Sequence, residues 1–294
     1  APFAQEQMHA GLLRPDSEPA PAYGEVTRVA RELAEIRLEG TASQGRIALI
    51  YDYESEWAWE IQPQAAGFTH GNHVRELYSA FRKRGLDVDV LPPSTSSFAG
   101  YDIVAIPALL AWTDSMRDAV AKFDGHVLIG PRTGSKTAHF SIPTRLGPDL
   151  PQNLLDARVA RVDSLPAGIE VAVKGGGAAR LWREKVEGSA EIVMEDVEGL
   201  PVLLCQGKLF YLTASGDQAL VQRVADYLIA EADTPTLALP AGVRCRVRGQ
   251  YRIYVNYGTG TQTLIPAQDE VGYVLGGATI PAAGVSVARC ARAD

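Results

Sequence analysis

The sequence predicts an α/β protein in which a doubly wound parallel sheet is followed by a small antiparallel β domain. The first observation is a series of short, nearly continuous apolar runs, beginning with residues 46–51 and separated by helix-like segments. Such runs are typical of parallel strands that are buried on both faces. The second observation is the alternation of apolar and polar residues between 243 and 255, which indicates antiparallel strands. Hydrophobic residues make up 46% of the chain and charged residues 21%, which is enough for a packed core.

An amphipathic helix is expected before the sheet. Prolines at positions 15, 19 and 21 mark a boundary loop in front of it. Helical spacing then relates five apolar residues, Val26, Val29, Ala30, Leu33 and Ile36. Charged residues occupy the other side of this segment, and Gly40 marks its end.

The parallel sheet is predicted from alternating strands and helices. Its strands are expected at residues 46–51, 88–91, 102–106 and 126–129. One helix is expected at residues 73–84, before Gly85, and another is capped by Asp114 and runs to Lys122. This βαβ rhythm predicts a doubly wound parallel sheet.

Residues 132–200 are less regular, and we expect an insertion with some antiparallel β structure there. The sheet then resumes at residues 202–205 and 209–212, which a tight hairpin at 206–208 joins. A helix over about 217–231 closes this domain.

The C-terminal region, residues 240–294, is predicted to form a small antiparallel β domain. Its strands alternate over 243–247 and 251–255, a Gly-Thr-Gly-Thr turn follows at 258–261, and further β patches lie at 273–275 and 285–287. A domain of about 55 residues is marginal for independent stability, so we expect it to pack on the rest of the protein.

Composition excludes several classes of protein. The chain has 28 Lys and Arg against 35 Asp and Glu, and this acidic balance argues against a nucleic-acid binder. No window approaches the ~18 apolar residues of a membrane span. The three cysteines, Cys205, Cys245 and Cys290, are far apart, which disfavours a disulfide framework or a zinc site and favours a cytoplasmic location. The opening Ala1-Pro2-Phe3 has neither an initiator Met nor a signal-peptide pattern, so we expect a processed or truncated start.

The loop at residues 130–137 suggests two kinds of chemistry, and both are disfavoured. A phosphate loop needs Lys directly after its second Gly, but Ser135 separates Gly134 from Lys136. A nucleophile elbow would place Ser135 between glycines, and Thr137 stands where the second Gly belongs. The simpler interpretation is a surface loop after a sheet strand.

Two histidines, His70 and His73, are spaced for a shared metal ion at a helix start. Zinc normally takes three or four protein ligands, and no third ligand is identifiable. We therefore favour two polar residues at a helix N-terminus.

The acidic and aromatic stretch at residues 51–60 follows the first parallel strand. Parallel sheets bind ligands or partners at the carboxyl ends of their strands. Glu54, Trp57 and Trp59 are therefore candidates for an interface or a substrate funnel. A loop that packs its tryptophans onto the core is an equally supported alternative.

Three segments, residues 2–13, 52–58 and 130–136, resemble segments of the β-galactosidases of glycoside hydrolase family 42. They occur in the same order along the chain as in that family. The resemblance implies the tail of a (β/α)8 barrel at residues 1–40. It further implies a flavodoxin-like or amidotransferase-like trimerisation domain at 41–237 and an all-β domain at 238–294.

The resemblance also implies part of a retaining β-galactosidase that acts on terminal β-D-galactosyl residues. Its two catalytic glutamates, and a zinc site found in some members, are expected upstream of residue 1, with no cofactor or metal in this chain. Glu6 and His9 match a Glu-x-x-His motif that hydrogen-bonds the galactosyl hydroxyls. A galactoside substrate and a homotrimer are the expected partners, without nucleic acid or membrane. The isolated chain is expected to be inactive, because the reaction needs both carboxylates.

Two other functions stay open. A non-catalytic interaction module would use the α/β domain as a trimer scaffold, with Trp57 and Trp59 at the interface. A stand-alone amidotransferase-like enzyme is less favoured, because the 130–137 loop lacks an elbow.

Overall fold

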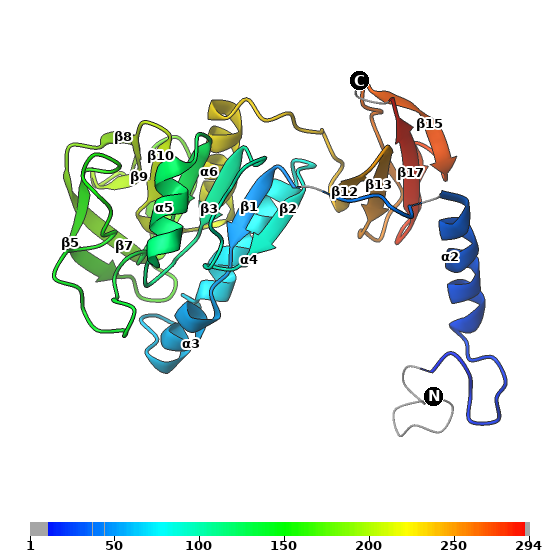
Figure 1. Ribbon diagram of the computed structural model, residues 1–294, viewed down its shortest axis with the longest axis horizontal. Coiled ribbons are helices and arrows are strands. Elements are labelled where there is room, and N and C mark those ends of the chain that lie inside the picture. The colour runs from blue at the N-terminus through cyan, green and yellow to red at the C-terminus, as the bar shows by residue number, and fades with distance from the viewer. Residues whose placement is uncertain (1–10, 37, 44, 292–294) are drawn as a thin grey trace. The chain divides into compact units, whose positions relative to one another are not determined.

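The computed structural model describes residues 11–36, 38–43 and 45–291, and the chain divides into two compact units. Gln44–Leu239 form one unit, which we call the α/β unit. Ala1–Ser43 and Pro240–Asp294 together form the other, which we call the β unit. The chain thus starts in the β unit, builds the whole α/β unit, and then returns to the β unit (Figure 1).

The main sheet of the α/β unit has seven strands in the order β2-β1-β3-β4-β10-β9-β8 within the described residues. The strands are β1 Ile47–Ile50, β2 Val88–Leu91, β3 Ile103–Ile106, β4 His126–Ile129, β8 Glu191–Glu195, β9 Pro201–Gln206 and β10 Leu209–Leu212. The first five strands in that order pair in parallel, and their order is that of a flavodoxin-like sheet. Strands β9 and β8 add antiparallel pairs. The sheet is therefore mixed, and the prediction of a parallel sheet is confirmed only for its larger part.

Four helices of this unit start at side-chain caps. They are α3 Tyr53–Ile61, α4 His70–Arg82, α5 Asp114–Lys122 and α6 Gln218–Glu231. Thr69 caps α4, so that helix begins three residues before the predicted start. Thr113, rather than Asp114, caps α5. The stretch after β1, for which a loop was one interpretation, forms the helix α3.

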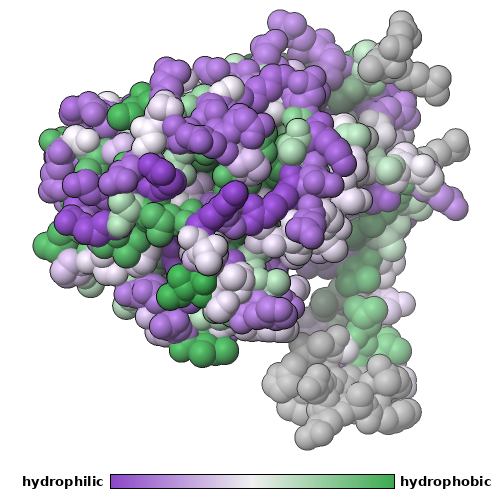
Figure 2. Space-filling view, turned by 60° about the vertical axis from the view of Figure 1, so that its left-hand side comes forward, coloured by the Kyte–Doolittle hydropathy of each residue, from purple (hydrophilic) through white to green (hydrophobic). Residues whose placement is uncertain are grey.

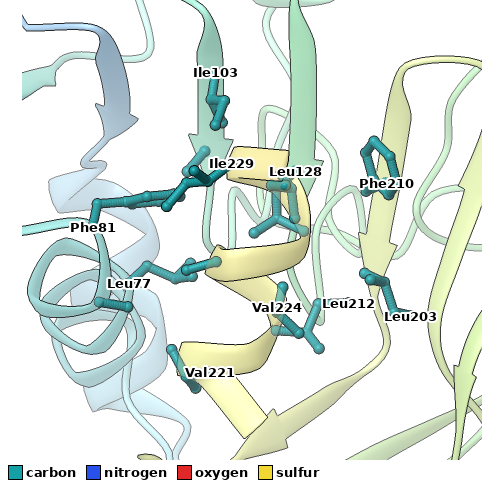
Figure 3. Close-up of a cluster of buried hydrophobic side chains, with 14 of the residues drawn as sticks. Leu77, Phe81, Ile103, Leu128, Leu203, Phe210, Leu212, Val221, Val224 and Ile229 are labelled. Atoms are coloured by element: carbon teal, nitrogen blue, oxygen red, sulfur yellow. The ribbon is translucent and has the colours of Figure 1, made fainter. Parts of the chain in front are cut away.

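Helices cover both faces of the sheet, as a doubly wound fold requires (Figure 1). On one face, Leu77 and Phe81 of α4 and Val224 of α6 pack against strand residues such as Leu128 (Figure 3). On the other face, Met116 of α5 packs in a separate buried cluster. The two buried clusters, one on each face of the sheet, therefore hold the strands in place.

The predicted antiparallel insertion forms a second sheet in the order β11-β7-β5, with β6 also paired to β7. Its strands are β5 Ala157–Ser164, β6 Glu170–Ala172, β7 Ala178–Gly188 and β11 Ala214–Gly216. Strand β7 carries two buried residues of the candidate site, Trp182 and Glu184.

The β unit contains the predicted helix and antiparallel strands. Helix α2 Tyr23–Ile36 precedes a sheet in the order β12-β13-β17-β15. Its strands are β12 Val243–Arg248, β13 Tyr251–Asn256, β15 Glu270–Leu275 and β17 Val285–Cys290, and β14 Gln262–Thr263 pairs with β16 Thr279–Ile280. Ile36 of α2 is buried with Tyr251 and Val287. The apolar residues Val26, Val29 and Leu33 are exposed, so the described residues bury only the end of this helix.

No helix in the described ranges is both long and apolar enough to cross a membrane. On the face that Figure 2 shows, hydrophilic residues predominate over the α/β unit, and hydrophobic residues are scattered among them.

Candidate functional site at the carboxyl edge of the parallel sheet

Asp52 positions helix α3 at the end of strand β1. Its carboxylate accepts hydrogen bonds from the backbone N–H groups of Glu54 at 3.3 Å and Ser55 at 3.0 Å, which caps the helix. The Ser55 hydroxyl donates to the same carboxylate and accepts a hydrogen bond from the Leu110 N–H at 3.0 Å. This chain of contacts joins the end of β1 to the segment after β3.

The two tryptophans of α3 face opposite environments. Residues two apart on a helix do not share a face. Trp57 is 57% exposed, and Glu54 is also exposed, whereas Trp59 is 2% exposed. Trp59 packs edge-on against Phe68 with the ring centroids 4.8 Å apart. Of the three candidate residues, Trp59 thus belongs to the core, while Glu54 and Trp57 lie at the surface.

His70 and His73 begin α4 and point into the aromatic cluster around Trp59. Burial lowers the pKa of His70 to about 4, although Asp52 acts in the opposite direction. Burial, together with His70 and Arg180, lowers the pKa of His73 to about 3. Both imidazoles are therefore neutral at pH 7. The described residues contain no group of three or more His, Cys, Asp or Glu side chains that could hold a metal ion.

The loop at 130–137 is tied to the end of β3 by its backbone. The N–H of Gly134 donates to the Leu109 carbonyl at 2.8 Å, and that of Lys136 donates to the Leu110 carbonyl at 2.9 Å. Both N–H groups are therefore hydrogen-bonded within the protein and are not free to bind a phosphate. No α-helix lies between β4 and β5, a stretch that is described throughout. A phosphate loop and a nucleophile elbow both need a helix at that point, so the loop forms neither.

The Arg132 guanidinium lies close to two indole rings. The guanidinium carbon lies 4.7 Å from the Trp59 ring centroid and 5.8 Å from that of Trp182. The side chain is 8% exposed, and its buried Nη1 has no hydrogen-bond partner within the described part of the chain. Burial lowers the pKa of Arg132 to about 10, while Glu184 opposes this shift, so the group stays charged at pH 7.

Glu184 of β7 is a buried acid that contacts both Arg132 and Trp182. It accepts hydrogen bonds from the Arg132 backbone N–H at 2.8 Å, from Trp182 Nε1 at 3.1 Å and from the Tyr211 hydroxyl. Burial raises the pKa of Glu184 despite these donors, and burial and Glu184 raise that of Tyr211. By accepting the Arg132 N–H, Glu184 fixes the Arg132 backbone, and no ion pair joins the two side chains among the described residues.

Sequence reasoning missed Trp182, Glu184 and Tyr211. The available signal was the spacing of Trp182 and Glu184, which places both on one face of a strand. That signal was hidden because the region around β7 lacks a regular pattern.

A hollow of about 390 Å³ opens beside α3, and we call it the Trp57 pocket. Its lining comes from α3, from the segment after β3 and from the loop after β4. The lining residues are Glu54, Trp57, Ala58, Ile61, Gln62, Leu110, Arg132, Lys136 and Phe140. Two of the three segments singled out in the sequence, 52–58 and 130–136, therefore meet here. The third segment, with Glu6 and His9, lies outside the described residues.

The sequence profile of a family described as "Beta-galactosidase trimerisation domain" matches residues 45–235. The chain belongs to the β-galactosidases of glycoside hydrolase family 42. The match covers nearly all of the α/β unit, which holds the Trp57 pocket.

Relatives of this family extend the similarity along the chain. A β-galactosidase of Thermus thermophilus is 42% identical over 280 residues, which is 94% of this chain and 43% of the relative. The crystal structure of a β-galactosidase from psychrophilic Marinomonas ef1 is 34% identical with a TM-score of 0.92, over 99% of this chain and 46% of that one. A β-galactosidase structure from Halorubrum lacusprofundi is 28% identical with a TM-score of 0.88, again over 99% and 46%. The chain thus spans less than half the length of these relatives, and the predicted family is confirmed.

Proposed function

We propose that the chain forms the oligomerisation part of a cytoplasmic, retaining β-galactosidase that removes terminal non-reducing β-D-galactosyl residues. The observation that carries this proposal is the match of residues 45–235 to a β-galactosidase trimerisation domain. The 42% identity to a β-galactosidase from Thermus thermophilus supports the same activity for the intact protein.

Helix α2 supports the proposal that residues 1–40 are the tail of a catalytic barrel. Its apolar residues Val26, Val29 and Leu33 are 44%, 40% and 50% exposed. Contiguous exposed apolar side chains are typical of surfaces that pack against another structure. If α2 is part of the barrel, the remainder of the barrel would pack on this face and cover them.

The proposed chemistry uses carboxyl groups of that barrel. In a retaining glycosidase one carboxyl group protonates the leaving oxygen while the other forms a glycosyl-enzyme, and the two lie ~5 Å apart. Glu6 and His9 contribute to the galactose subsite, where a carboxylate and an imidazole hydrogen-bond neighbouring hydroxyls. A site of this kind discriminates against sugars whose hydroxyls are misplaced.

Release of nitrophenol from nitrophenyl β-galactoside tests the activity. The intact protein should turn over this substrate, and the 294-residue chain should show none. Turnover by the purified chain alone would contradict the proposal. An inactive intact protein that still forms trimers would instead favour a non-catalytic interaction module.

Analytical ultracentrifugation of the intact protein tests the assembly. The family match leads us to expect a trimer at micromolar concentration. A strict monomer would remove the oligomerisation role.

A further inference from the structure

Arg132 is a largely buried cation that forms no direct ion pair among the described residues, although the charge of Glu184 acts on it. Its guanidinium stacks on Trp59 and Trp182, and Nη1 has no hydrogen-bond partner among the described residues. A buried charge is costly unless it is paired or hydrogen-bonded. The neighbouring Glu184 is already occupied by three donors, of which the Arg132 backbone N–H is one. The Arg132 side chain therefore has capacity to bind an anion that the described residues leave unused.

The Trp57 pocket is the place from which such an anion can reach Arg132. Arg132 and Lys136 both line the pocket, and no ion pair is formed by Lys136 within the described ranges. Glu54 is the one acidic residue of the described lining. The pocket therefore offers two cations against one acid, which favours a negatively charged occupant.

The pocket also has an apolar rim that continues onto the protein surface. Trp57 and Ile61 are 57% and 84% exposed, and Phe140 lines the same hollow. The Tyr53 ring, which is 64% exposed, lies 6.0 Å from the Trp57 ring and extends this surface along α3. Exposed aromatic side chains beside an arginine are typical of the centre of a protein interface.

We propose that the Trp57 pocket receives an Asp or Glu side chain of a second copy of the protein, placed against Arg132 and Lys136, with apolar neighbours on Trp57 and Ile61. This inference rests on the proposed trimer. The apolar surface along α3 extends beyond the pocket, so the occupant is a protein segment rather than a small anion. The family is described by its trimerisation, and the chain carries 35 Asp and Glu against 28 Lys and Arg, so a second copy can supply an acidic side chain. Three identical contacts of this head-to-tail kind close into a ring.

Zero-length cross-linking identifies the occupant directly. A carbodiimide joins an amine to a carboxylate that is in contact with it, so it should link Lys136 to an acidic residue. The intact protein is assembled from an equal mixture of ¹⁴N-labelled and ¹⁵N-labelled copies, and the linked peptides are identified by mass spectrometry. Mixed-isotope peptides containing Lys136 are expected. Links from Lys136 confined to single-isotope peptides, or a trimer without links from Lys136, would overturn the proposal.

Charge variants of the intact protein test the energetic role of the pocket. Lys136→Glu and Arg132→Met should each weaken trimer formation about tenfold or more, because each removes a charge-assisted hydrogen bond. Lys185→Glu makes the same charge change at an exposed position of β7 outside the pocket and should assemble like the wild type. Added salt should weaken the wild-type trimer more than the Lys136→Glu trimer.

Sedimentation over a dilution series separates failure of this inference from failure of the proposed function. A monomeric wild type would refute the trimer itself. A trimeric wild type with Lys136→Glu at the same association constant would refute only the role of the pocket. Circular dichroism checks the Arg132→Met fold, and if that variant is unfolded, Lys136→Glu and the cross-link decide.

Discussion

Gly134 shows how one residue holds the loop of the candidate site in place. Its φ angle is +67°, and a Cβ atom there would lie 2.1 Å from the Pro148 carbonyl oxygen. That carbonyl already accepts a hydrogen bond from Trp112 Nε1 at 2.8 Å, so it cannot move away freely. The position therefore requires glycine for both its backbone angle and its lack of a side chain.

We predict that Gly134→Ala lowers the free energy of unfolding by about 2–4 kcal/mol, through backbone strain and the collision with Pro148. Urea unfolding measures the change. Gly168→Ala is the matched control, because Gly168 also has a positive φ of +81° but has open space around its Cβ position. The control should cost only about 1 kcal/mol. Equal losses in the two variants would show that the Pro148 contact does not matter.

The buried histidines predict a pH dependence of stability. Their pKa values in the folded protein, about 4 for His70 and about 3 for His73, lie below the ordinary 6.5. Between the folded and the unfolded pKa values, the unfolded chain binds more protons than the folded protein. The contribution of the neutral histidines to the free energy of unfolding is therefore complete above pH 6.5 and is lost as the pH falls toward 4. Each histidine contributes at most about 1.4 kcal/mol per pH unit in that window.

We expect His73→Phe to make the free energy of unfolding less sensitive to pH between 6.5 and 4.5, since the aromatic ring stays but the titrating group is gone. Urea titrations at pH 7.5, 6.0 and 5.0 give the slope. His139→Phe, at an exposed position, is the control and should keep the wild-type slope. An unchanged slope in His73→Phe would mean that its imidazole does not titrate differently on unfolding.

At the scale of elements, helix α3 decides the character of the candidate site. The sequence indicated an acidic, aromatic segment after β1 but left its conformation open. Once Asp52 caps a helix, Trp57 and Trp59 must lie on different sides, because residues two apart on a helix diverge. The sequence therefore identified the right segment, while its helical conformation determined which tryptophan reaches the surface.

We predict that Asp52→Ala destabilises the protein by about 1–2 kcal/mol, because it removes the cap of α3 and the acceptor for Ser55. Thermal unfolding and Trp fluorescence report the loss. Asp52→Asn keeps a capping acceptor and should cost much less. If the two variants had the same stability, the cap would not be what holds α3.

Strand β7 is the second decisive element. It lies in the region that the sequence described only as an insertion with antiparallel structure, and that description is confirmed. The strand brings Trp182 and Glu184 to a loop that is distant along the chain, since Glu184 is 52 residues from Arg132. No local pattern in the sequence could reveal a contact of this range.

At the scale of the whole molecule, the α/β unit carries its own hydrophobic core on both faces of the sheet. Within the described residues, the apolar faces of its helices and strands pack against one another in two clusters, and every residue of these clusters belongs to the α/β unit. This arrangement predicts that the α/β unit folds by itself.

We expect a polypeptide of residues 45–239 to unfold in a single cooperative urea transition with a near-ultraviolet circular dichroism signal of packed aromatic residues. A polypeptide that binds hydrophobic dyes and unfolds without cooperativity would contradict the prediction, because those are the properties of a loosely packed state.

The sequence by itself determined most strands and helices of the parallel part of the sheet, the antiparallel character of the C-terminal strands and the family of the protein. These properties follow from apolar periodicity and from short segments, both of which are local in the chain. Only the tertiary structure decided that β8 adds a further antiparallel strand beside the predicted hairpin of β9 and β10, that Trp59 is buried while Trp57 is exposed, and that Arg132 lies close to two indoles without an ion pair among the described residues. The physical reason is that burial, stacking and charge pairing depend on which distant segments meet, and those meetings are made by packing rather than by local propensity.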